Sequence, residues 1–146
     1  MIFAAAGNDS ERPGRAISAK YASPFNWAAI EVVGLGITSG VVVEAHDQAG
    51  NAAGFTNSSG HLSCGGVDVL SSVALDESGQ PSTRSYAVMS GTSMASPLCA
   101  AAFELLRKVR PNHTVEKLLA CATGGTRKNS NGTPIFDLES AAQLCP

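Results

Sequence analysis

Short apolar runs separated by polar stretches dominate the first part of this chain. We predict a strand at each of four such runs, residues 2–6, 28–35, 41–45 and 67–75. The run at residues 2–6 is continuously apolar, which is typical of a strand buried on both faces, as in a parallel sheet. The stretches between them are rich in Gly, Asn, Ser and Pro, a composition typical of turns. We expect loops at residues 10–26, 47–66 and 76–85.

The pattern changes near residue 94, where apolar residues begin to recur at helical spacing. A first helix is predicted over residues 94–109, with Pro97 in its first turn, where a missing N–H costs little. Thr114 is the expected N-cap of a second helix that runs to residue 122, and Asp137 that of a short last helix. Strands alternating with helices predict an α/β fold with a largely parallel sheet, in a single domain over residues 1–146.

The composition of the chain favours a packed domain over a disordered, nucleic-acid-binding or membrane protein. The 146 residues are 44% hydrophobic and 15% charged, which predicts a packed domain rather than a disordered chain. The net charge is −2, and the basic residues are scattered, so nothing favours nucleic-acid binding. No apolar run approaches the length of a membrane span, and we expect no membrane partner.

The chain has four cysteines, Cys64, Cys99, Cys121 and Cys145, and none has a metal-binding spacing. Four cysteines allow three disulfide pairings, and the sequence does not choose among them. Cys99 falls on the apolar helix, where we expect a buried free thiol. The triplet Asn57-Ser58-Ser59 matches the glycosylation pattern, but such triplets arise often by chance in a Ser-rich chain.

The segment Gly91-Thr92-Ser93-Met94-Ala95-Ser96-Pro97 carries the clearest chemical signal. It places a serine between a glycine turn and the first turn of the predicted helix, where backbone N–H groups can stabilise negative charge on a substrate oxygen. The simpler interpretation is that Thr92 or Ser93 only caps the helix.

Residues 91–101 resemble the active-site serine signature of subtilisin-like serine proteases, the subtilases. Each constrained position of that signature is matched here, by Gly91, Thr92, Ser93, Ala95, Pro97, Ala100 and Ala101. The resemblance implies a subtilisin-like fold of three layers with a mostly parallel sheet. It also implies a serine endopeptidase that cleaves polypeptides through an acyl-enzyme on Ser93.

A second match is Phe3-Ala4-Ala5-Ala6-Gly7-Asn8, which looks like the family's strand ending in Ala-Ala-Gly-Asn. The resemblance implies that Asn8 contributes to the oxyanion hole and that Ala5, Ala6 and Gly7 line the pocket for the residue before the cut. Further similar segments lie at residues 29–34, 55–60, 67–69 and 137–142. The resemblance covers nearly all of the chain and corresponds to the carboxyl-terminal half of a subtilase catalytic domain.

The catalytic histidine and aspartate of the family lie upstream of the asparagine strand and find no match here. His46, His61 and His113 are not followed by Gly-Thr, and Asp9 is not followed by Ser/Thr-Gly. We therefore expect a fragment that is inactive until the amino-terminal half of the same domain is supplied. The alternative is a non-catalytic binding or interaction protein that keeps the half-fold.

The remaining expectations concern cofactors and location. Calcium commonly stabilises subtilases, so the resemblance implies Ca²⁺ as a candidate cofactor, but no compact carboxylate cluster can be assigned to it and we predict no metal ligand. We expect an extracellular protein, although the opening apolar run at residues 2–6 is too short for a signal-peptide core.

Overall fold

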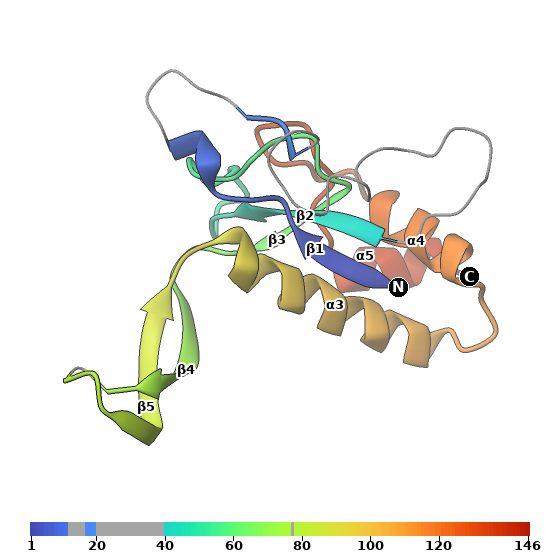
Figure 1. Ribbon diagram of the computed structural model, residues 1–146. Helices are drawn as coiled ribbons and strands as arrows, with labels where there is room; N and C mark the ends of the chain where they lie inside the picture. The colour runs from blue at the N-terminus through green and yellow to red at the C-terminus, as the bar shows by residue number, and fades with distance from the viewer. Residues whose placement is uncertain (12–16, 20–39, 77) are drawn as a thin grey trace.

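The structure of the protein is a computed structural model that describes residues 1–11, 17–19, 40–76 and 78–146. Its elements are β1 (Ile2–Ala5), η1 (Asp9–Glu11), β2 (Gly40–His46), β3 (Leu62–Gly65), β4 (Val69–Leu75), β5 (Pro81–Met89), α3 (Thr92–Val109), α4 (Val115–Thr123) and α5 (Leu138–Leu144). Figure 1 shows β1, β2 and β3 side by side, α3 running along them, and β4 and β5 projecting away from this body.

The three strands form a parallel sheet in the order β1-β2-β3. Phe3 of β1 lies opposite Val41 of β2, and Val43 of β2 lies opposite Leu62 of β3. The central strand β2 is buried from Gly40 to Ala45, and the prediction of a strand at residues 41–45 is confirmed. The strand predicted at residues 2–6 is present as β1, but Ile2 is exposed, so the expectation of burial on both faces is wrong there. The mixed α/β architecture with a parallel sheet also agrees with the sequence prediction.

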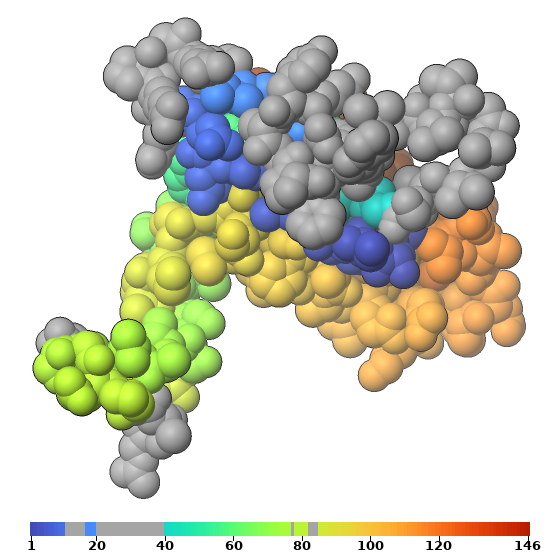
Figure 2. Space-filling view, in the orientation of Figure 1, coloured from blue at the N-terminus to red at the C-terminus, as the bar shows by residue number. Residues whose placement is uncertain are grey.

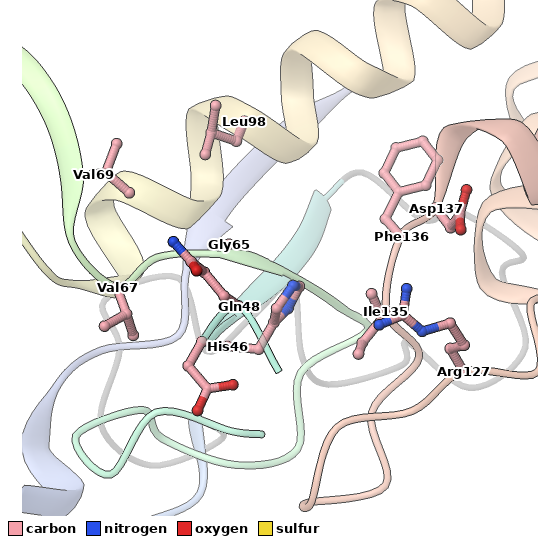
Figure 3. A pocket seen from close by; sticks show the side chains of 11 residues that line it. His46, Gln48, Gly65, Val67, Val69, Leu98, Arg127, Ile135, Phe136 and Asp137 are labelled. Atoms are coloured by element: carbon pink, nitrogen blue, oxygen red, sulfur yellow. The ribbon is translucent and has the colours of Figure 1, made fainter. Parts of the chain in front are cut away.

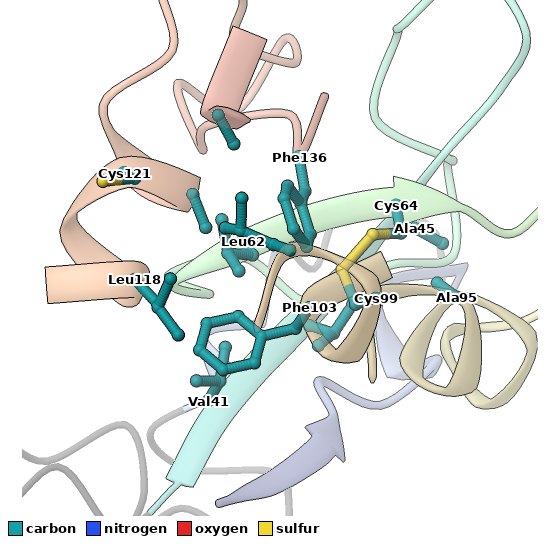
Figure 4. Close-up of a cluster of buried hydrophobic side chains, with 14 of the residues drawn as sticks. Val41, Ala45, Leu62, Cys64, Ala95, Cys99, Phe103, Leu118, Cys121 and Phe136 are labelled. Carbon is teal, nitrogen blue, oxygen red and sulfur yellow. A yellow bond between two sulfur atoms is a disulfide. The ribbon is translucent and has the colours of Figure 1, made fainter. Parts of the chain in front are cut away.

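Helix α3 covers one face of this sheet and forms the main core with it (Figure 4). Val41, Leu62, Phe103 and Phe136 are buried in this core, which α4 and α5 complete at the far end of α3. The ring of Phe103 packs on Phe3 of β1, with centroids 5.5 Å apart and planes inclined by 56°. Because successive strand residues point to opposite faces, Val42 faces the other way and packs with Ala6 and Ala19.

Two further contacts fix the start of α3 on the sheet. The Ser96 hydroxyl donates to the carbonyl of Phe3 in β1 over 3.0 Å. A disulfide joins Cys99 of α3 to Cys64 of β3. The first two turns of α3 are thereby tied to both outer strands of the sheet.

The expectation of a free thiol at Cys99 is wrong. Cys99 is fully buried as expected, but it is bonded to Cys64, and Cys121 is bonded to Cys145. The sequence could not choose this pairing because it did not place a strand at residues 62–65, beneath the second turn of α3. Strand β3 was predicted as loop, since it is only four residues long and glycine-rich segments flank it.

Strands β4 and β5 form an antiparallel hairpin outside the main sheet (Figure 2). The prediction of a strand at residues 67–75 is confirmed in part, but residues 81–85, predicted as loop, belong to β5. The reason is a tight turn, in which the Asp76 carboxylate accepts the N–H groups of Ser78 and Gln80 at 2.9 Å each. The exposed fractions of Leu70 and Tyr86 are 67% and 69%, so the hairpin leaves apolar side chains uncovered by the described residues.

The helix boundaries largely follow the sequence signals. The Thr114 hydroxyl accepts from Lys117 N–H at the start of α4, and Asp137 accepts from Glu139 and Ser140 N–H at the start of α5, as predicted. Pro97 is not in the first turn, because α3 begins at Thr92 and Pro97 is its sixth residue. The predicted strand at residues 28–35 and most of the loop predicted at 10–26 lie outside the described residues.

A buried carboxylate holds the carboxyl-terminal loop against β2. Glu44 is fully buried, and its Oε1 accepts from Gly60 N–H and the Thr133 hydroxyl at 2.8 Å each. Its Oε2 accepts from the side-chain amides of Asn129 at 2.9 Å and Asn131 at 3.1 Å. Four neutral donors thus satisfy this carboxylate, as a buried charge requires.

The Cys64–Cys99 disulfide generates the first prediction. Replacing both residues by serine should lower the free energy of unfolding by about 2–4 kcal/mol, because the bond closes a loop of 35 residues in the unfolded chain. Denaturant unfolding under oxidising conditions measures this change. The Cys121–Cys145 disulfide closes a shorter loop of 24 residues, so replacing both of these cysteines by serine should lower the free energy of unfolding slightly less. An unchanged unfolding midpoint after loss of Cys64–Cys99 would contradict the expected role.

Candidate active site

The end of β1 and the start of α3 meet at the two residues that carry the predicted chemistry. After β1 the chain turns through Gly7 and Asn8, and Ser93 is the second residue of α3. The side chains of Asn8 and Ser93 are both exposed. Residues 84 positions apart meet here, because Thr92 N–H donates to the Asn8 side-chain carbonyl over 3.0 Å.

Thr92 fixes the orientation of the Asn8 amide. Its hydroxyl donates to the same oxygen, Asn8 Oδ1, over 2.8 Å, and it accepts from Gly7 N–H over 3.2 Å. A backbone N–H can only donate, so Oδ1 must face Thr92 and the amide nitrogen must face the other way. The Nδ2 group of Asn8 is therefore held with its N–H bonds directed away from Thr92.

The absence of a side chain at Gly91 leaves a space between two nitrogens. A Cβ on Gly91 would lie 3.2 Å from Asn8 Nδ2 and 3.8 Å from the backbone nitrogen of Ser93. Met94 Sδ lies 3.5 Å from the same point, so both nitrogens and this sulfur border the position that a Cβ would take. Two N–H donors beside a serine hydroxyl have the composition of an oxyanion-binding site.

The backbone amides at the start of α3 show which donor remains available. Thr92 N–H donates to Asn8, and the N–H groups of Met94 and Ala95 both donate to the carbonyl of Gly91. Within the described part of the chain, the N–H group of Ser93 has no hydrogen-bond acceptor. The first amides of a helix usually lack an acceptor within the helix. Gly91 occupies the N-cap position without any side-chain cap, so the interpretation of Thr92 or Ser93 as a simple cap is wrong.

The three residues predicted to line a substrate pocket lie along the same segment. Ala6 is fully buried against Val42, whereas Ala5 and Gly7 are half-buried. Gly7 has a φ of +95°, which side chains rarely adopt, and a Cβ there would lie 2.5 Å from Asn57 Nδ2. The assignment of these residues to a substrate pocket stays a prediction.

None of the three histidines is hydrogen-bonded to Ser93. His46 Nδ1 pairs with the Ser63 hydroxyl at 2.9 Å, and His61 Nδ1 accepts from Val42 N–H at 3.0 Å. His113 Nε2 lies 3.0 Å from the carbonyl of Pro146, at the end of the chain. The described structure therefore brings Ser93 and Asn8 together without a histidine base.

Two residues that shape this site were not identified as functional from the sequence. Thr92 was part of the matched signature but was given no role, although it orients Asn8. Asn57 was noted within a glycosylation triplet and within the family-like segment 55–60 but was given no role, yet it is fully buried and bonds the segment around Asn8. No local pattern distinguishes a buried asparagine from an exposed one, so only the tertiary structure could find it.

Comparison with known proteins now identifies the family. The model of the subtilase family matches residues 1–133. The chain belongs to the subtilase family. Comparison with curated protein sequences finds no match.

Solved proteases share the fold of this subtilase chain. A protease from Pseudoalteromonas arctica is 23% identical, with a TM-score of 0.73 over 97% of this chain and 42% of that protein. The prenylagaramide maturation protease PagA is 18% identical, with a TM-score of 0.62 over 97% of this chain and 49% of that protein. The protease domain of PatA is 20% identical, with a TM-score of 0.64 over 98% of this chain and 47% of that domain. The chain thus spans less than half the length of each.

A separate pocket of about 320 Å³ lies around His46 (Figure 3). Leu98 of α3 and Val69 at the base of the hairpin form one wall, Phe136 forms another, and Arg127 also lines the pocket. Ser93 and Asn8 are not among its lining residues. Burial lowers the pKa of His46, the charge of Arg127 lowers it further, and Asp47 partly opposes both effects.

The described residues show neither a metal-binding cluster nor a membrane-spanning helix. No group of three or more His, Cys, Asp or Glu side chains in residues 1–11, 17–19, 40–76 and 78–146 is placed to hold a metal ion. Within the same ranges, no helix has the length and apolar character needed to cross a bilayer.

The lowered pKa of His46 predicts a pH dependence of stability. As the pH falls below the ordinary value of 6.5, the unfolded chain takes up a proton at this residue before the folded chain does. The free energy of unfolding should therefore decrease from pH 7 toward pH 5, and His46→Gln should reduce that decrease. Chemical denaturation of both proteins across this range measures it. Identical pH profiles for the two proteins would show that His46 does not contribute.

Proposed function

We propose that this subtilase chain carries the nucleophile and the oxyanion-binding site of a serine endopeptidase. One observation carries the proposal: Thr92 holds the Asn8 amide so that its Nδ2 group and the Ser93 amide border one space beside Gly91. The exposed hydroxyl of Ser93 is on the residue that supplies one of these donors. Membership of the subtilase family supports a peptidase with a polypeptide substrate.

The proposed reaction begins with attack of Ser93 Oγ on the carbonyl carbon of a peptide bond. The hydroxyl proton passes to a base, and the carbonyl oxygen becomes an oxyanion that accepts from Asn8 Nδ2 and Ser93 N–H. The intermediate expels the amine, which takes the proton from the base, and leaves an acyl group on Ser93. Attack by water, assisted by the same base, releases the acid and restores the hydroxyl.

We propose that the base and its orienting acid come from the amino-terminal half of the same catalytic domain. The histidines of this chain are bonded to Ser63, Val42 and Pro146, and the chain spans 42% to 49% of the proteases that share its fold. Losing the base of a subtilase costs on the order of 10⁶ in turnover. The chain by itself should therefore be inactive toward peptides.

The substrate pocket and the location are part of the same proposal. Ala5, Ala6 and Gly7 lead directly to Asn8, and their small side chains leave room for a bulky apolar residue before the cut. The disulfides Cys64–Cys99 and Cys121–Cys145 favour an oxidising compartment, which supports secretion.

Two substitutions in the full-length protein test the catalytic roles. Ser93→Ala should abolish peptide hydrolysis and labelling by a fluorophosphonate, because the attacking oxygen is lost. Asn8→Ala should lower kcat by about 10²–10³-fold with little change in KM, since the amide acts on the oxyanion rather than on bound substrate. Steady-state kinetics and mass spectrometry of the labelled peptide measure both effects.

The control for this test is His113→Ala, which removes a side chain bonded to the carbonyl of the last residue. Its kcat should match that of the unchanged protein. Labelling of a serine other than Ser93, or an Asn8→Ala variant with unchanged kcat, would refute the proposed roles.

A non-catalytic binding protein is the second candidate. The observation that favours it is that the three histidines are all engaged away from Ser93. This candidate predicts that the full-length protein neither hydrolyses peptides nor reacts with a fluorophosphonate, and it fails if Ser93 is labelled.

A further inference from the structure

The polar atoms of the buried Asn57 side chain all form hydrogen bonds with one short segment, residues 6–10. Asn57 lies in the loop between β2 and β3 and is fully buried. Its Nδ2 donates to the carbonyl of Ala6 and to Asp9 Oδ2, at 2.9 Å each. Its Oδ1 accepts from Asp9 N–H and the Ser10 hydroxyl, at 3.1 Å each. Its backbone N–H donates to the carbonyl of Gly7 at 3.0 Å.

These five bonds bracket Asn8 without involving its side chain. Two of them hold the residues before it, and three hold the residues after it. Asn57 therefore fixes the backbone of the turn, whereas Thr92 fixes the carbonyl of the Asn8 amide. The orientation of Asn8 Nδ2 depends on both.

The fit between Asn57 and the turn is close. A methyl group on Gly7 would lie 2.5 Å from Asn57 Nδ2 and 3.0 Å from Asp9 Oδ2. Gly7 also has a φ of +95°, so the turn combines a backbone conformation that favours glycine with direct contact to the Asn57 amide. The turn has little room to relax while Asn57 is in place.

Asn57 is itself held by the body of the protein. The neighbouring Thr56 is buried, and its hydroxyl accepts from Ala45 N–H of β2 over 3.0 Å. On the other side, Ser58 N–H donates to the carbonyl of Ile17 over 2.9 Å. The buried and fully bonded amide also excludes a glycan on the Asn57-Ser58-Ser59 triplet in the folded protein.

We propose that Asn57 is a positioning residue for the oxyanion-binding amide of Asn8. The inference rests on the proposed function and gives a role to Asn57, which lies in the family-like segment at residues 55–60 but was assigned no role there. Asn57 touches neither substrate nor nucleophile, and it acts through the backbone of residues 6–10. A displacement of about 1 Å at a catalytic group can cost about 10²-fold in rate. We expect loss of Asn57 to lower kcat about 10–100-fold with KM changed less than about threefold, because Asn8 acts mainly in the transition state.

Asn57→Ala and Asn57→Asp in the full-length protein separate the contributions of this side chain. Alanine removes all four side-chain bonds. Aspartate keeps an acceptor for Asp9 N–H and Ser10 but loses both donors, and it places a carboxylate beside Asp9 Oδ2 and the carbonyl of Ala6. Both variants should lower kcat per folded molecule. If Asn57→Ala does not fold, Asn57→Ser provides a smaller change at the same place.

Asn129 provides a matched structural control. It is also a buried asparagine, its Nδ2 donates to the carboxylate of Glu44, and its Oδ1 accepts from Asn131 and Thr133 N–H at 3.0 Å each. Asn129→Ala and Asn129→Asp therefore disturb an equivalent network, one that bonds Glu44 of β2 and contains neither Asn8 nor Thr92. Their folded molecules should retain kcat within about twofold even where stability falls as much as in the Asn57 variants.

A double substitution tests whether Asn57 acts through Asn8. In an Asn8→Ala background there is no amide left to position, so adding Asn57→Ala should lower kcat by less than about twofold. An equal loss of kcat with and without Asn8 would overturn the proposal, and so would an Asn57→Ala variant with unchanged kcat.

Amide hydrogen exchange gives a readout that does not need activity. Asn57→Ala should increase exchange at residues 7–10 more than at the start of α3, whereas Asn129→Ala should not. If the unchanged protein neither cleaves peptides nor is labelled at Ser93, the proposed function fails and this measurement decides the positioning role alone. Unchanged exchange at residues 7–10 in Asn57→Ala would overturn it.

Discussion

The pair of hydrogen bonds from Thr92 to Asn8 Oδ1 is the interaction on which the candidate site depends. It joins the end of the first strand to the start of the helix that carries Ser93, across 84 positions of sequence. Because the same oxygen accepts from both the amide and the hydroxyl of Thr92, the side-chain amide of Asn8 has only one consistent orientation. Its nitrogen must then face the space that Gly91 leaves open beside the Ser93 amide.

This interaction requires the strand and the helix to be held in register, and the core provides that. Ser96 bonds β1, Cys99 is covalently joined to β3, and Phe103 packs on Phe3 further along the same helix. Asn57 provides the corresponding support on the other side, through residues 6–10. The candidate site is thus built from small contributions of several elements, each anchored in the parallel sheet.

The sequence predicted the parts of the fold whose signals are local. The buried strand β2, the helix α3 and the caps Thr114 and Asp137 follow from periodicity and side-chain chemistry within a few residues. The strand β3 and the start of β5 were missed, because a four-residue strand between glycine-rich segments and a hairpin closed by Asp76 depend on partners. The thiol of Cys99 was misjudged for the same reason, since its partner Cys64 lies on the missed strand.

In the candidate site, too, local motifs could be recognised in the sequence, whereas contacts between distant segments could not. Ser93 and Asn8 were selected from the sequence by their resemblance to two family motifs, and their proximity is a property of the tertiary structure. The orienting role of Thr92 and the buried network of Asn57 depend on contacts between segments about 50 to 85 positions apart, which no sequence spacing reveals. The subtilase family match extends over both motifs and supports interpreting them together.

The central claim is that Asn8 Nδ2 and Ser93 N–H bind the same oxygen. A crystal structure of the full-length protein with a phosphonate or boronate bonded to Ser93 tests it most directly. One oxygen of the adduct should lie about 2.7–3.1 Å from both nitrogens, beside Gly91. An adduct whose oxygens all point away from Asn8, or one that forms on another serine, would contradict it.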